Sequence, residues 1–267
     1  MAKENEFSRR AFLAGVTGLA ATSQIAAGGQ SADPPVTAKT VQKLYKVPES
    51  REPNDLQFVP EGLWILDQVD PNQAFLVVPE DGTILRTIQT ESLHGSGITF
   101  GDGMLWIGST LGKDKYDPPR TLKVDPMTGK TLKWWVTNGY GYYGGSTPEG
   151  GTPSGAHGLK WIGDKYWMAV PATGRILLIE PETGAIVRSI PGPGTTQRTH
   201  GLAVDGDMIW CVNSDDRAIF KLDSADGAPV AKIQLVREDP EPHGLDIDST
   251  GTLWYCDAVS GWICRLV

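Results

Sequence analysis

Residues 242–267 read PHGLDIDSTGTLWYCDAVSGWICRLV, and this stretch decides the fold. It opens with a His-Gly pair at His243, continues through an apolar run to Trp254, and ends with a third apolar segment after a second turn. The apolar segments are too short for helices, are rich in β-branched and aromatic residues, and are separated by Asp, Ser, Thr and Gly. The stretch therefore predicts three short β-strands joined by tight turns.

The same pattern recurs upstream. His157 and His200 open the copies HGLKWIGDKYW and HGLAVDGDMIW, and these two histidines and His243 follow one another at a constant interval of 43 residues. Two further copies, HGSGITFGDGMLW and NDLQFVPEGLW, carry His94 and Asn54 at the corresponding position. A period of about 40 to 45 residues with four strands per copy is typical of a propeller blade. The five copies predict an all-β, five-bladed β-propeller, with six blades as the alternative.

The end of the chain indicates how the ring closes. The last copy stops after three strands, and residues 40–47 (TVQKLYKV), which precede the first full copy, are expected to supply its fourth strand. Pairing the first strand with the last blade removes exposed sheet edges. We therefore expect one propeller domain over residues 39–267, a linker over 33–38, and a signal segment over 1–32.

The N-terminal segment SRRAFLAGVTGLAATSQIAA resembles a twin-arginine secretion signal, with Arg9 and Arg10 as the paired arginines. The resemblance implies a periplasmic or secreted protein that the twin-arginine machinery exports already folded, with any cofactor inserted beforehand. The apolar run is too short and too weakly apolar for a stable membrane span.

Composition narrows the partners and the redox chemistry. A formal net charge of −8 gives little electrostatic support for binding nucleic acid, so a small-molecule substrate is the expected partner. Of the three cysteines, Cys256 and Cys264 lie on consecutive predicted strands. Either they form a disulfide and leave Cys211 free, or all three are buried thiols.

All four histidines precede a glycine, and together they predict a metal site. The innermost strand of each blade borders the central channel, so the repeated position becomes a ring at the channel mouth. Neutral imidazoles bind a divalent transition metal such as Zn, Mn, Fe or Cu. Ser96 and Gly97 are two extra residues between His94 and its strand, which makes His94 the least secure member of the ring. The alternatives are a structural ring of hydrogen-bonded histidines and a catalytic site without metal.

Long insertions are expected to project over this ring. Residues 139–156 (GYGYYGGSTPEGGTPSGA) are glycine-rich and hold Tyr142, Tyr143 and Glu149, and residues 111–120 form a second, shorter insertion. Four candidate catalytic residues follow from these positions: His243, Tyr142, Tyr143 and Arg198. Asn54 is expected to complete the ring as a weak oxygen ligand or a hydrogen-bond donor. The other polar side chains expected to support the histidines are Asp67, Asn213, Asp239, Glu241 and Asp257.

The final copy also resembles blades of virginiamycin B lyase, of the gluconolactonase (senescence-marker) family and of NHL-type propellers. The shared features are the Pro-His-Gly-Leu opening, the D-x-x-G turn and the Leu-Trp pair. The lyase resemblance implies a histidine base and a divalent metal, and by position in the blade it points to His243 and His200. Gluconolactonases instead hold one divalent ion with Glu, Asn and Asp, whereas the repeated position of this chain offers histidines.

These observations favour an exported, metal-dependent lyase that removes a proton beside a carbonyl or carboxylate of a small polar or anionic substrate. In this interpretation Arg198 holds the substrate charge. A lactonase or esterase that uses metal-bound hydroxide is one alternative, and a non-catalytic binding or scaffold propeller is the other.

Overall fold

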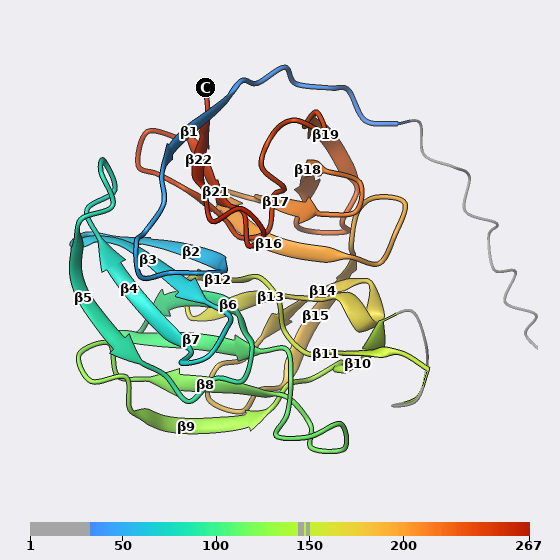
Figure 1. The fold of residues 1–267 in the computed structure, drawn as a ribbon. Helices are drawn as coiled ribbons and strands as arrows, with labels where there is room; N and C mark the ends of the chain where they lie inside the picture. Colours follow the sequence, from blue (N-terminus) through green and yellow to red (C-terminus); the bar gives the residue numbers. More distant parts are fainter. Residues whose placement is uncertain (1–32, 144–146, 148–149) are drawn as a thin grey trace, which may run out of the picture. The chain divides into compact units, whose positions relative to one another are not determined.

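The computed structural model describes residues 33–267 except 144–146 and 148–149, so the signal segment with Arg9 and Arg10 lies outside it, as does Glu149. Residues 34–267 form one compact unit. In this unit five four-stranded antiparallel sheets follow one another along the chain (Figure 1). The prediction of an all-β, five-bladed propeller is confirmed.

The blades share one meander, in which each strand pairs with the next. Blade 1 contains β2 (Pro53–Val59), β3 (Gly62–Asp67), β4 (Gln73–Val77) and β5 (Ile84–Gln89). Blade 2 contains β6 (Gly95–Gly101), β7 (Met104–Ser109), β8 (Arg120–Val124) and β9 (Thr131–Val136). Blade 3 contains β12 (Leu159–Ile162), β13 (Lys165–Val170), β14 (Arg175–Ile179) and β15 (Ile186–Pro191). Blade 4 contains β16 (Thr199–Asp205), β17 (Met208–Asn213), β18 (Ala218–Asp223) and β19 (Pro229–Gln234).

Blade 5 is built from both ends of the propeller unit. It contains β20 (Leu245–Ile247), β21 (Leu253–Cys256), β22 (Ile263–Leu266) and β1 (Val41–Tyr45). β1 pairs antiparallel with β22, and the blue and red strands lie side by side in Figure 1. Thr40 and Val267 extend this ladder by exchanging two backbone hydrogen bonds of 2.9 and 3.0 Å. The predicted closing strand is thus present, two or fewer residues shorter at each end than residues 40–47.

The segment expected to be a linker also contributes pairing. Val36 forms a parallel bridge with Lys232 on β19, the outermost strand of blade 4. The backbone N–H of Thr37 donates to the Lys232 carbonyl at 2.7 Å. The residues before β1 therefore lie against blade 4 before they enter blade 5.

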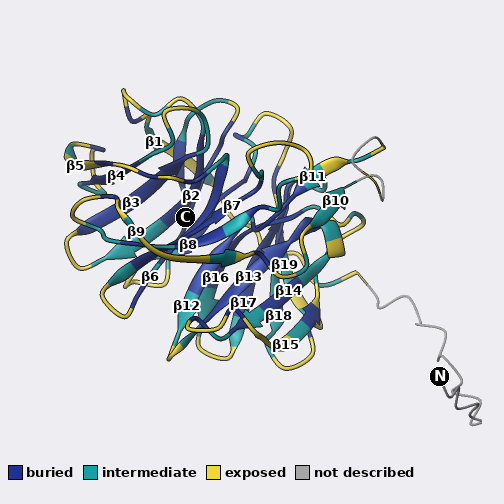
Figure 2. Ribbon diagram, turned by 90° about the horizontal axis from the view of Figure 1, so that it is seen from below, coloured by how far each residue is buried: buried dark blue, intermediate teal, exposed yellow. Residues whose placement is uncertain are grey.

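Apolar clusters between neighbouring blades hold the ring together, and the second strand of every blade supplies a tryptophan to them. Trp106, for example, is fully buried between blades 2 and 3, against Leu159, Tyr166 and Met168. Figure 2 shows the buried strands at the centre and exposed turns around them. The equivalent tryptophans, all 9% exposed or less, are Trp64, Trp167, Trp210 and Trp254. Large aromatic rings suit this role because each buries a large apolar area on both neighbours.

The three cysteines are buried and free. Cys256 pairs with Ile263 and Tyr255 pairs with Cys264, so the two thiols point to opposite faces of blade 5. Cys256 packs in the cluster shared with blade 1, whereas Cys264 packs in the cluster shared with blade 4. Of the two alternatives from the sequence, three buried thiols is therefore the one that the structure supports.

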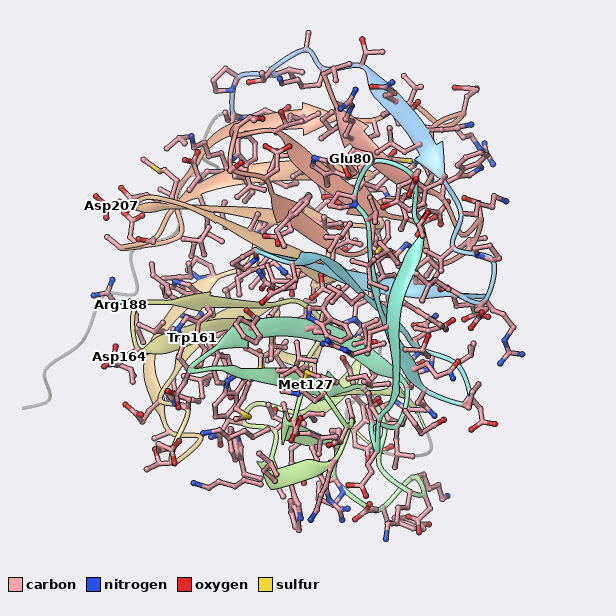
Figure 3. All side chains as sticks on the ribbon, turned by 90° about the vertical axis from the view of Figure 1, so that its left-hand side faces the viewer. Glu80, Met127, Trp161, Asp164, Arg188 and Asp207 are labelled. Atoms are coloured by element: carbon pink, nitrogen blue, oxygen red, sulfur yellow. The ribbon has the colours of Figure 1, made fainter. Side chains whose placement is uncertain are left out.

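The innermost strands run from the histidine positions to polar turns at the opposite face. Asp164 and Asp207 lie in two such turns, and Figure 3 shows both along the same side of the molecule. The described part of the chain contains no helix with the length and apolarity that a membrane crossing requires.

Candidate functional site

Strand register defines which residues form the ring at the channel mouth. In each blade, one apolar residue of the innermost strand pairs with the residue that directly follows the tryptophan of the second strand. These apolar residues are Leu56, Ile98, Leu159, Leu202 and Leu245. The residue two positions earlier is therefore the equivalent ring position in every blade. These ring residues are Asn54, Ser96, His157, His200 and His243.

Glycine after the ring residue allows neighbouring blades to approach closely. A Cβ atom at Gly158 would lie 2.4 Å from the His200 carbonyl oxygen, and one at Gly97 would lie 1.8 Å from that of His157. Real Cβ atoms do not approach a backbone so closely, so only glycine fits. The same packing occurs at Gly201 against His243 and at Gly244 against Asn54.

Three imidazoles of the ring are in contact. The ring centroids of His157 and His200 lie 4.3 Å apart at an interplanar angle of 68°, and those of His200 and His243 lie 5.2 Å apart at 83°. His94 lies two residues before the ring position of blade 2, which Ser96 occupies, and has a positive φ of 56°. The backbone thus sets His94 apart from the other three histidines.

Several polar atoms of the ring are buried and have no hydrogen-bond partner among the described residues. They are both ring nitrogens of His200, Nδ1 of His157 and Oδ1 of Asn54. His200 is only 2% exposed. A buried polar atom without a partner costs on the order of 1–3 kcal/mol, and such atoms are uncommon in native structures. Such atoms are candidate contacts for an ion, water or a substrate group.

The imidazoles are uncharged at neutral pH. Burial, with smaller contributions from the charges of Arg198, His94 and His243, lowers the pKa of His157 to about 3. Burial and the neighbouring imidazoles lower the pKa of His200 well below its usual range. Burial also lowers the pKa of His94. Each imidazole therefore has a nitrogen lone pair that can accept a proton or bind a metal.

His243 differs from the other histidines because carboxylates lie beside it. Its Nε2 is 3.6 Å from Oε1 of Glu241 and its Nδ1 is 3.9 Å from Oδ1 of Asp257. Burial lowers the pKa of His243, and the charges of Glu241 and Asp257 oppose that shift. Nδ1 also lies 3.3 Å from the Glu241 carbonyl oxygen, which fixes the orientation of the ring.

A small cavity of about 130 Å³ opens beside the ring on the side of blades 2 to 4. Its wall contains three imidazoles, one guanidinium and several hydroxyls, from His94, Thr110, Tyr143, Thr152, Pro153, Ser154, His157, Pro171, Arg198 and His200. His243, Asn54 and Tyr142 are not part of this wall. Among the predicted site residues, the fold thus brings together His94, His157, His200, Arg198 and Tyr143.

Arg198 is held at the cavity wall by blade 4. Its Nε donates to Oγ of Ser214 at 3.0 Å and lies 3.6 Å from Oδ1 of Asp215. The hydroxyl of Tyr143 donates to the other oxygen of Asp215 at 2.7 Å. This hydrogen bond is the main reason that the pKa of Tyr143 is raised, so the hydroxyl stays protonated.

A short hairpin of β10 (Gly141–Tyr143) and β11 (Thr152–Ser154) forms part of the wall. Tyr142 donates to the backbone carbonyl of Lys115 in the blade 2 insertion at 3.1 Å, while Tyr143 reaches Asp215 on blade 4. The two tyrosines therefore attach the hairpin to the blades on either side of it, and only Tyr143 borders the cavity.

The polar residues expected to support the ring act as caps of the loops that lead into it. Asp67 accepts the backbone N–H of Arg51 at 2.7 Å, and Asp257 accepts that of Glu241 at 3.0 Å. Asn213 donates to the carbonyls of Pro193 and Thr196 at 2.9 and 3.1 Å. Asp239 accepts the N–H of Val236 at 3.2 Å. Asp67, Asn213 and Asp239 thus fix the loops, whereas Asp257 and Glu241 also lie beside the His243 imidazole.

Within residues 33–143, 147 and 150–267, no group of three or more His, Cys, Asp and Glu side chains has the arrangement of a metal site. The ring nitrogens of the three contacting imidazoles do not converge on one point as they stand. A shared metal ion would therefore require rotation of imidazole side chains on the backbone described above.

Several cavity residues are absent from the sequence-based candidates. Ser154 lies 3.4 Å from Nε2 of His157, and Thr110 donates to the ring residue Ser96 at 2.7 Å. The sequence does identify Ser96 as the ring residue of blade 2 if the blades are aligned on the glycine and the apolar residue that follows it. Aligning them on the His-Gly pair selects His94 instead. Ser154 lies in the insertion 139–156 that the sequence places over the ring, but no motif distinguishes it there, and Asp215 reaches Tyr143 from a loop of blade 4.

Comparisons with known proteins bear on the fold. No family model and no curated protein sequence matches the chain. Among solved structures, the glutaminyl cyclase of Myxococcus xanthus superposes with a TM-score of 0.65 at 11% identity, over 88% of this chain and 98% of that one. The computationally designed protein Ika8 gives a TM-score of 0.44 at 14% identity, over 79% of this chain and 57% of its own. At such identities the likeness to the cyclase, which is an enzyme, establishes for this chain a shared β-propeller architecture.

Proposed function

We propose that the mature chain is an exported, metal-dependent lyase that acts at the histidine ring on a small substrate carrying a carboxylate. The observation that carries the proposal is His200, whose two buried ring nitrogens lack partners in the described structure while neutral imidazoles lie on both sides of it. The cationic Arg198 in the same cavity favours an anionic substrate.

The three contacting imidazoles, His157, His200 and His243, are the residues that would hold a divalent transition metal. Their donor chemistry fits Zn, Mn, Fe or Cu, because all three are neutral at pH 7. Glu241 and Asp257 beside His243 are of the kind that orient a metal-binding imidazole. When bound, such an ion would polarise a carbonyl or carboxylate oxygen and acidify the neighbouring C–H bond.

The remaining cavity residues supply the other parts of an elimination. The Arg198 guanidinium binds the substrate carboxylate. His94, which is neutral and lies on the cavity wall outside the ring, accepts the proton when the C–H bond breaks. The C–H electron pair forms the new double bond, and the bond to the leaving group breaks. The protonated hydroxyl of Tyr143 donates a proton to that leaving group. This proposal moves the base from His243 to His94, because His243 does not border the cavity.

Metal content tests the proposal directly. Protein folded in the cytoplasm and purified without chelator should contain on the order of one transition metal per chain. The His200→Asn variant should contain little, and the Arg198→Lys variant, which keeps the ring intact, should retain the metal. If the wild-type protein neither contains such an ion nor binds added Zn²⁺ or Co²⁺, the metal-dependent reading is wrong.

A second candidate function is the cyclisation of an N-terminal glutaminyl residue, the activity named for the Myxococcus xanthus protein. The observation in its favour is a small cavity that combines neutral imidazoles with the hydroxyls of Tyr143 and Ser154. In that reaction the substrate amine forms a bond to the side-chain amide carbon and ammonia leaves. An imidazole would take the amine proton, and a hydroxyl would protonate the departing amide nitrogen, which leaves as ammonia. Ammonia release from a glutaminyl peptide in the presence of chelator would favour this candidate over the lyase.

A further inference from the structure

A buried cluster of ionisable side chains lies on the innermost strands directly after the ring residues. Asp55 follows the ring residue Asn54 and occupies the position that is glycine in the other four blades. Asp55 is 0% exposed, Lys160 on β12 is 3% exposed, and Asp246 on β20 is 4% exposed. The innermost strands of three blades thus place ionisable side chains where a channel would otherwise run.

The Asp55 carboxylate bonds to the strands that follow three other ring positions. It accepts the backbone N–H of Ile98 at 2.8 Å, of Leu159 at 3.5 Å and of Leu245 at 3.3 Å. Each donor lies two residues after a ring residue, namely Ser96, His157 or His243. Among the described residues, no such bond comes from blade 4, whose ring residue is His200.

Lys160 completes the cluster from blade 3. Its Nζ lies 3.9 Å from Oδ1 of Asp55 and donates to the backbone carbonyls of Leu56, a short contact, and of Ile98 at 3.3 Å. One ammonium therefore joins blades 1, 2 and 3 across the axis. Buried ionisable groups of this kind require a partner and further hydrogen bonds, and the cluster supplies both.

We infer that Asp55, paired with Lys160, is the positioning residue of the histidine ring. It fixes the strands behind Ser96, His157 and His243 relative to blade 1 and blocks the channel below them. The ring consequently communicates with solvent on the side of the cavity, and not through the axis. The inference builds on the site of the proposed function, but it concerns the arrangement of the imidazoles with or without a metal.

The test uses the four histidines as four NMR probes in the full-length protein after treatment with chelator. In the Asp55→Asn variant, the imidazole carbon–hydrogen signals of His157 and His243 should shift more than those of His200 and His94. Four unchanged signals, or four equal shifts, would overturn the inference. Asp248→Asn is the matched control. It replaces a carboxylate that accepts a hydrogen bond from the Trp254 indole N–H at 2.8 Å in a distant turn, and it should leave all four histidine signals unchanged.

A second variant covers the case in which the single substitution does not fold. Asp55→Asn combined with Lys160→Met removes the buried pair together and leaves Asp246 with its hydrogen bonds from Gln57 and the Phe58 N–H, and it should give the same pattern of shifts. If wild-type protein binds Co²⁺, Asp55→Asn should weaken that binding about tenfold or more. If wild-type protein binds no Co²⁺ while the NMR pattern holds, the proposed function fails and the positioning role of Asp55 stands.

Discussion

The position of each imidazole is decided by the residue that follows it. Only glycine lets the backbone of one blade contact the ring-residue carbonyl of the next, and Gly97, Gly158, Gly201 and Gly244 do so. In blade 2 this requirement selects Ser96-Gly97 over His94-Gly95. His94 is thereby released from the ring and placed on the cavity wall. Steric packing of the backbone, and not the presence of an imidazole, defines membership of the ring.

His200 carries the clearest prediction at the residue scale. Because its two buried nitrogens lack partners within the described part of the chain, replacing it with an apolar ring should not destabilise the metal-free protein. We expect His200→Phe to raise the free energy of unfolding in chelator by about 1 kcal/mol, measured by urea denaturation. Stabilisation by added Zn²⁺ should disappear. His94→Phe is the control, since His94 is partly exposed and should give no such gain; a loss of stability in His200→Phe would mean that the nitrogens are satisfied.

At the scale of elements, a hairpin outside the five blades shapes the cavity. β10 and β11 pair with each other and pack on the short 3-10 helix Pro171–Thr173, and the hydroxyls of Tyr142 and Tyr143 add hydrogen bonds to the blades on either side. A two-stranded hairpin is marginally stable by itself, so these two side-chain bonds contribute to how firmly it lies beside the ring.

Removing either hydroxyl should therefore loosen the hairpin and leave the blades unchanged. In Tyr142→Phe and Tyr143→Phe, we expect faster amide hydrogen exchange at Thr152 and Ser154 with a melting temperature within about 1 °C of wild type. Tyr140→Phe serves as the comparison, because Tyr140 is 45% exposed. Equal exchange rates in all three variants would show that packing alone holds the hairpin.

At the scale of the whole molecule, two kinds of buried ionisable group change the stability of the protein in opposite directions as pH rises. Burial lowers the pKa of His157 and His200, so the unfolded chain takes up protons below pH 6.5 that the folded chain does not. Stability therefore rises with pH towards 6.5. Burial raises the pKa of Asp55 to about 7, with Lys160 opposing the shift. The folded chain then keeps a proton that the unfolded chain loses above its ordinary pKa of 3.8, which lowers stability as pH rises.

Replacing Asp55 should expose the imidazole contribution. In Asp55→Asn, the free energy of unfolding of metal-free protein should rise with pH more steeply than in wild type, by about 1.4 kcal/mol per unit between about pH 5 and pH 6.5. Urea denaturation across this range measures the slope. The same slope in both proteins would mean that Asp55 is already ionised in the folded state.

The sequence by itself determined the fold, because a propeller is a local repeat. The 43-residue interval, the tryptophan of each second strand and the missing last strand each report on contacts within one blade or its neighbour. The ring of histidines could be predicted for the same reason, because the histidines recur at one position of the repeat. Only the tertiary structure decided which side chains meet across the axis, such as Asp55 with Lys160, or at the cavity, such as Asp215 with Tyr143 and Arg198. Those contacts join residues more than 15 positions apart, and often different blades, so they depend on strand register and loop paths that no local pattern encodes.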